Sequence, residues 1–246
     1  MSGKQRIDGQ VAYILHSYPY SESSLMLDVF SRDHGRLPLL ARGARRPRSA
    51  LRGVLQAFQP LELGWFGGGE VRTLAKAEWL GGVPLLAGTA LMLGYYLNEL
   101  LLKLLVREDA HAVLFESYAS TVQALAQGEA GSEPHAACLR QFEQTLLREL
   151  GYGLVLERDA VTDEAVLPDM NYCYLIEKGP VKVDASSAAD HTYTMRGKTL
   201  LDLARNDYAD PRTLAESKML MRMLINHHLA GQALQSRRVF VELQEL

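Results

Sequence analysis

Arginines are concentrated in one stretch of the chain, from His34 to Leu61, that contains no acidic residue. They are Arg36, Arg42, Arg45, Arg46, Arg48 and Arg52. Guanidinium groups at this density repel one another unless a polyanion or water lies between them, and phosphate oxygens match their planar fork of donors. Gly43 and Pro47 keep the densest part out of a helix and indicate an exposed loop. We predict that this loop binds phosphate groups. The alternative is a solvated loop, although such loops normally mix charges of both signs.

Aromatic residues accompany these arginines in the first 80 residues. Single-stranded nucleic acid is held by a basic groove together with aromatic side chains on which bases stack. Most of these rings are expected to fill a core. Tyr18 and Tyr20 fall in a polar, turn-like segment from Ser17 to Ser23, so we predict that they are the stacking residues.

No residue pattern in the sequence predicts catalysis or metal binding. His227 and His228 are adjacent and would diverge by about 100° on a helix, so they cannot chelate one metal ion. Gly67, Gly68 and Gly69 lack the Lys-Ser/Thr ending of a phosphate-binding loop and predict a hairpin instead. We expect no enzyme, no cofactor and no metal site. A nuclease would need carboxylates or histidines gathered around a metal ion.

A second candidate site lies on a predicted helix over 134–150. Leu139, Phe142, Leu146 and Leu150 share one side of this helix, and Arg140 stands at the margin. A cation beside an apolar groove is suited to the acidic and hydrophobic tail of a partner chain. Arginines at the rim of a buried face are common, so an ordinary rim residue is the alternative.

The overall composition is that of a globular protein, but its charge is unevenly distributed. The chain has 246 residues, of which 48% are hydrophobic and 22% charged, and this length suits one or two domains. The net charge of −3 divides into +4 for residues 1–80 and −7 for residues 81–246. Two cysteines build neither a disulfide framework nor a four-thiolate zinc site. The first residues lead into alternation rather than an apolar signal segment, so we expect a reducing cytoplasm.

Short β-patterns fill the first 80 residues, and no helix strong enough for a βαβ crossover separates them. The predicted strands cover 11–16, 25–30, 36–42, 61–66 and 71–77. Five short strands in about 70 residues favour a small barrel of the OB type. We therefore predict a barrel domain over 1–80.

Residues 81–246 are predicted to form a mainly helical domain. Trp79 to Asn98 contains no charged residue, but Gly81, Gly82 and Pro84 interrupt it, so a fully buried central helix is favoured over a membrane span. Residues 152–195 lose helical periodicity and suggest a small subdomain with strands at 171–176 and 180–183. Helices are predicted over 89–107, 111–127, 134–150, 198–205 and 210–229.

Several of these segments, taken in order, resemble the RecO family of bacterial recombination mediators. The matching segments are 12–30, 35–45, 55–61, 96–101, 139–143 and 150–153. Each alone is unspecific, but their order is specific, and together they cover most of residues 10–155. Similarity is weaker from there to about residue 240.

The resemblance implies an α+β protein: an N-terminal OB-fold followed by a helical domain. It implies a cytoplasmic, nucleoid-associated DNA repair and recombination protein with no membrane segment. Such a protein binds single- and double-stranded DNA and anneals complementary strands. It also binds the C-terminal tail of single-stranded DNA-binding protein (SSB) and works with RecR to load RecA at gaps.

The same resemblance places the barrel arginines in the family's DNA-binding surface. With the two stacking tyrosines predicted above, the DNA-binding set is Arg36, Arg42, Arg45, Arg46, Arg48, Arg52, Arg72, Tyr18 and Tyr20. Arg140 matches the position that receives the SSB tail, with Phe142 and Leu146 beside it. The competing interpretation is a non-catalytic OB-fold adaptor that binds protein or structured RNA.

One departure from the family concerns zinc. Many relatives carry a four-cysteine zinc module after the segment that matches Gly151, Tyr152 and Gly153. Here residues 154–195 contain only Cys173, and a single thiol does not hold structural zinc. We therefore expect a metal-free form of this insertion.

Overall fold

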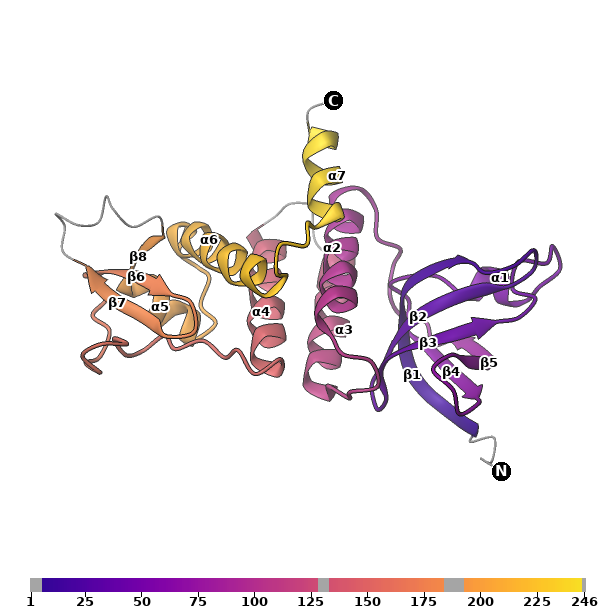
Figure 1. Ribbon diagram of the computed structural model, residues 1–246. Coiled ribbons are helices and arrows are strands. Elements are labelled where there is room, and N and C mark those ends of the chain that lie inside the picture. Colours follow the sequence, from indigo (N-terminus) through magenta and orange to yellow (C-terminus); the bar gives the residue numbers. More distant parts are fainter. Residues whose placement is uncertain (1–5, 128–132, 184–192, 245–246) are drawn as a thin grey trace. The chain divides into compact units, whose positions relative to one another are not determined.

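The computed structural model describes residues 6–127, 133–183 and 193–244 (Figure 1). These residues form two compact units. The barrel unit comprises Met1–Ser132 and Ala233–Leu246, and the helical unit comprises Glu133–Gln232. The α+β class predicted from the sequence is confirmed.

Five strands of the barrel unit close into a barrel. They are β1 (Arg6–Pro19), β2 (Leu25–Ser31), β3 (Gly35–Ala41), β4 (Leu61–Phe66) and β5 (Arg72–Trp79). Their order is β1-β2-β3-β5-β4. All pairings are antiparallel except that of β3 with β5. The short helix α1 (Leu51–Val54) lies between β3 and β4 in the chain. The predicted five-stranded OB-type barrel is confirmed.

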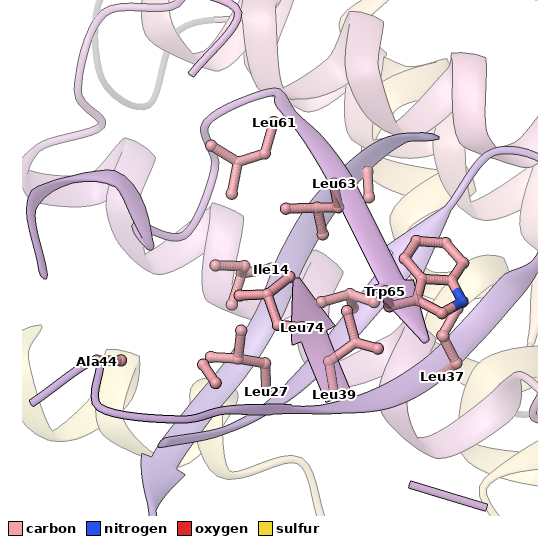
Figure 2. Close-up of a cluster of buried hydrophobic side chains, with 12 residues drawn as sticks. Ile14, Leu27, Leu37, Leu39, Ala44, Leu61, Leu63, Trp65 and Leu74 are labelled. Carbon is pink, nitrogen blue, oxygen red and sulfur yellow. The ribbon is translucent and has the colours of Figure 1, made fainter. Parts of the chain in front are cut away.

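Alternating residues of these strands fill the barrel with apolar side chains. Figure 2 shows this cluster, in which Ile14, Leu27, Leu39 and Leu63 point toward one another and Trp65 lies beside Leu37. Each of these six side chains is at most 1% exposed. Removing such a side chain from water contributes about 1.5–3 kcal/mol, so the barrel presents its loops from a firmly packed support.

Strand β1 is longer than the sequence predicted. The prediction covered 11–16, whereas β1 continues through Ser17, Tyr18 and Pro19, which pair with Leu27, Met26 and Leu25 of β2. Polar residues can extend a strand when their backbone is paired and their side chains face solvent, as these do. The prediction that Tyr18 lies in a loop is therefore wrong, while Tyr20 does lie in the β1–β2 connection.

Three helices complete the barrel unit: α2 (Gly88–Leu104), α3 (Ala112–Gln127) and α7 (Gln235–Gln244). On α2, the buried Asn98 amide donates to the Leu15 carbonyl of β1 at 2.8 Å and accepts the Tyr118 hydroxyl of α3 at 2.6 Å. The rings of Phe115 and Tyr118 pack on Tyr13 and Phe30 of the barrel. This compact unit thus continues past residue 80, where the sequence suggested a domain boundary.

The apolar segment that begins at Trp79 is not the fully buried helix that we expected. Its first part is an irregular connection in which Leu85 is 71% exposed, and on α2 itself Tyr95 is 46% exposed. The helix ends at Leu104, not Arg107. Across the described ranges, no helix is both long enough and apolar enough to cross a membrane.

The helical unit combines three helices with a small sheet. The helices are α4 (Glu133–Glu149), α5 (Gly197–Ala204) and α6 (Pro211–His228), and the strands are β6 (Asn171–Leu175), β7 (Gly179–Val183) and β8 (Thr194–Arg196). The sheet order is β7-β6-β8. Helix α6 begins as predicted, because the Asp210 carboxylate caps it by accepting the Arg212 N–H at 2.9 Å and Pro211 occupies the first turn.

A carboxylate fastens the irregular segment between α4 and β6. Asp159, which is 5% exposed, accepts backbone N–H groups from Val161 at 2.8 Å, Thr162 at 3.0 Å and Lys182 at 2.6 Å. Burial acts to raise the pKa of Asp159, but these hydrogen bonds outweigh it and leave the pKa below its ordinary value. The described residues contain no group of three His, Cys, Asp or Glu side chains that could hold a metal ion.

Candidate nucleic-acid interface and peptide site

The arginine-rich segment forms a chain of tight turns after β3. Gly43 has a φ of +70°, a conformation that favours glycine, and its carbonyl accepts the Arg46 N–H at 3.1 Å. The Arg46 carbonyl in turn accepts the Ser49 N–H at 3.0 Å. These turns keep the backbone compact and direct the long side chains into solvent. The predicted loop is confirmed.

Within the described residues, four arginines of this loop and of α1 form neither an ion pair nor a side-chain hydrogen bond. Arg42, Arg46, Arg48 and Arg52 are exposed, and none of them forms an ion pair with another residue in the described ranges. We call these four the free arginines. Their charges are fully available to an external anion.

Arg45 has a different role, because it joins two loops. Its Nη1 donates to the Ser21 carbonyl at 2.7 Å, and its backbone N–H donates to the Ser23 carbonyl at 2.9 Å. The β1–β2 connection is closed on itself by the Tyr20 N–H, which donates to the Ser24 carbonyl at 3.1 Å. Arg45 therefore fixes the tyrosine-bearing connection next to the arginine loop.

The two predicted stacking residues present open rings. Tyr20 is 61% exposed in the β1–β2 connection, and Tyr18 is 43% exposed near the end of β1. The Tyr18 ring lies 5.9 Å from the His16 ring, measured between centroids. An exposed aromatic face beside unpaired cations is the combination that holds single strands.

Arg36 and Arg72 do not join the free arginines. Arg72 on β5 pairs with Glu108 at 3.0 Å. Arg36 on β3 lies 3.7 Å from Asp28. Burial lowers the pKa of Arg36, and the nearby Arg107 adds to this while Asp28 opposes it. Both guanidinium groups thus have internal carboxylate partners, Asp28 on the neighbouring strand β2 and Glu108 in the segment after α2.

Arg107 is an exposed cation that sequence reasoning missed. It follows α2, and its backbone forms an isolated β-bridge with Arg36. The sequence predicted it as the last residue of a helix over 89–107, so no signal associated it with the barrel surface.

The second candidate site is more buried than expected. Arg140 on α4 is 9% exposed, and its Nη2 donates to Glu143 Oε1 at 2.9 Å. Glu143 is 1% exposed, and Phe142 and Leu146 are fully buried. Phe142 and Leu146 are therefore core residues that do not line an open groove, and Phe142, two positions after Arg140, does not share its face of α4.

Tyr208 lies next to this ion pair. Its hydroxyl accepts a hydrogen bond from the Gln144 amide of α4. Burial raises the pKa of Tyr208 to about 12, with smaller opposing effects from Gln144 and Arg140 and a further increase from Glu143. The three charged or polar groups of α4 and this hydroxyl form one polar cluster.

Both units match families of known proteins. Residues 9–83 match the family described as recombination protein O, N terminal, and residues 86–238 match recombination protein O, C terminal. The DNA repair protein RecO of Dechloromonas aromatica is 58% identical over 246 residues, covering 100% of both chains. That of Azoarcus sp. is 57% identical over 247 residues, again covering 100% of each. That of Ralstonia nicotianae is 50% identical over 243 residues, covering 99% of this chain and 87% of the relative.

The chain belongs to the RecO family of DNA repair proteins. The RecO N-terminal match covers the arginine loop and the five barrel strands from Gly9 onward. The RecO C-terminal match begins just before α2, so it includes helices of the barrel unit as well as the whole helical unit. Both candidate sites fall within matched regions.

Proposed function

We propose that this RecO-family chain is a recombination mediator that binds single- and double-stranded DNA through the barrel unit. The observation that carries this proposal is the set of four free arginines beside the exposed Tyr20. Neither Arg36 nor Arg72 belongs to the primary contact set, because each already has a carboxylate partner.

Binding is directed at the phosphate backbone and reads little sequence. Arginines on a turn-rich loop neutralise phosphates and release condensed counterions. If the four free arginines each engage one phosphate, log K falls with log salt at a slope of about −3 to −4. Stacking on Tyr18 and Tyr20 adds a preference for unpaired bases.

Annealing follows from the same surface. Two complementary strands repel each other through their phosphates, and a basic surface that neutralises both lowers this repulsion. Arg45 contributes indirectly, since it holds the tyrosine-bearing connection against the arginine loop.

The helical unit supplies recruitment in this proposal. Arg140 receives a carboxylate of the SSB tail, while the buried Phe142 and Leu146 anchor the helix that carries it. The protein then acts with RecR to promote RecA loading on SSB-covered gaps. The family membership and the polar cluster around Arg140 support this assignment.

The test compares charge reversals that change the net charge equally. The Arg46→Glu/Arg48→Glu variant is expected to lose at least tenfold in DNA affinity and most of the annealing of complementary oligonucleotides. The matched control is Lys218→Glu/Arg222→Glu, two exposed cations on α6, which should retain both activities. Fluorescence anisotropy at several salt concentrations and a strand-annealing assay give the readouts.

Two results would count against the proposal. Equal losses of DNA affinity in both variants would mean that the overall charge of the protein, and not the arginine loop, determines binding. DNA binding without annealing in the unmodified protein would favour an adaptor over an annealing mediator.

A further inference from the structure

The helical unit already contains an anion bound to the cation that we assign to the SSB tail. Glu143 stands one turn after Arg140 on α4, and its Oε1 accepts from Arg140 Nη2 at 2.9 Å. The Glu143 side chain is 1% exposed and that of Arg140 is 11% exposed. Because the carboxylate is enclosed, its charge acts on the guanidinium with little screening by water.

This arrangement divides the donors of Arg140 between two tasks. Nη2 is held by Glu143, and Nε is buried without a hydrogen-bond partner in the described ranges. The orientation of the guanidinium is therefore set from within the helix. A ligand carboxylate must bind the remaining edge of the same group, within a few ångströms of the Glu143 charge.

We infer that Glu143 is a built-in competitor that weakens the hold of Arg140 on an acidic peptide and keeps that binding reversible. The inference rests on the proposed function, in which Arg140 receives the tail. Like charges that share one partner oppose each other, so the second carboxylate binds with less free energy than it would gain from an unpaired arginine.

The decisive change removes the charge of Glu143 and keeps its shape. Glu143→Gln retains an oxygen that accepts from Arg140, so the guanidinium stays in place. We expect this variant to bind a fluorescein-labelled C-terminal SSB peptide about 3- to 10-fold more tightly at low salt, with a gain that shrinks as salt increases. Glu157→Gln, an exposed carboxylate in the same unit, is the control with the same change in net charge and should leave affinity unchanged.

The outcomes separate the two claims. If neither the unmodified protein nor Glu143→Gln binds the peptide, the tail site itself is wrong. If the unmodified protein binds, Arg140→Ala does not, and Glu143→Gln binds equally or more weakly, then Glu143 only orients Arg140 and the inference is overturned.

A second variant guards against a folding defect. Removing the counter-ion of a buried arginine destabilises the fold. Circular dichroism melting therefore has to show that Glu143→Gln still folds. If it does not fold, Glu143→Asp draws the carboxylate back from Nη2 and should tighten peptide binding by a smaller factor. Unchanged or weaker binding by a folded Glu143→Asp variant would then refute the inference.

Discussion

Asp159 should contribute more than any other side chain to holding the segment between α4 and β6 in its conformation. Replacing it with alanine removes one carboxylate that accepts three backbone N–H groups, from Val161, Thr162 and Lys182. Hydrogen bonds to a charged group contribute about 1.5–3 kcal/mol each. The donor residues are exposed, so water replaces part of the loss, and we expect a local destabilisation of about 2–4 kcal/mol.

The stabilisation of the fold by Asp159 should also depend on pH, and the direction follows from the shift of its pKa. The pKa of Asp159 is lowered in the folded protein, since hydrogen bonding outweighs the burial that acts to raise it. The carboxylate therefore stabilises the fold above its unfolded pKa of about 3.9 and loses this contribution as pH falls through the folded value. The difference between the unmodified protein and Asp159→Ala should be constant from about pH 5 to pH 8 and disappear in stronger acid.

The assay must report on the helical unit. The two tryptophans, Trp65 and Trp79, both lie in the barrel, so tryptophan fluorescence reports on the wrong unit. Hydrogen–deuterium exchange over 157–183 reports directly, and a loss of 2–4 kcal/mol corresponds to about 30- to 800-fold faster exchange. Asp169→Ala, an exposed carboxylate, is the control. Equal exchange in Asp159→Ala and Asp169→Ala would refute the fastening role.

Two further predictions concern the barrel unit. Glu99→Ala should release α7, because the Glu99 carboxylate accepts the Gln235 and Ser236 N–H groups at 2.9 Å and the Ser236 hydroxyl at 2.6 Å. Hydrogen–deuterium exchange should then become faster only in 235–244. Unchanged protection of these residues would contradict the prediction. Gly35→Ala should destabilise the barrel by about 2–4 kcal/mol, since its φ is +63° and a Cβ would lie 2.0 Å from the Asp109 carbonyl oxygen. Gly69→Ala, with no atom within 4 Å of its Cβ position, is the control in thermal melting, and equal shifts in both variants would exclude the steric explanation.

The barrel could be predicted because its signals are local. Alternating apolar residues and turn residues mark each strand, and the Gly67–Gly69 run makes the expected connection between β4 and β5. The C-terminal end of β1 was missed because Ser17 is polar and Pro19 is typical of turns, and only their pairing with β2 makes them strand residues.

Elements that depend on distant partners could not be predicted. Helix α7 was not predicted, and its first turn is capped by a glutamate 136 residues earlier in the chain. Strand β8 was not predicted either, since it has only three residues and exists through its pairing with β6. No local pattern signals either dependence.

The same limit applies to the arginines, and there it changes the functional argument. Counting cations identified a basic region but treated all of its guanidinium groups as equivalent. The structure separates them by their partners: Arg72 meets a carboxylate 36 positions later, Arg36 meets one from the neighbouring strand, and Arg45 meets a carbonyl. What remains for DNA is a smaller and more localised charge than the count suggested. The salt dependence of binding should therefore follow the four free arginines together with Arg45, whose partner is a neutral carbonyl, and not Arg36 or Arg72. A cation with an internal counter-ion releases fewer counterions when it meets a phosphate.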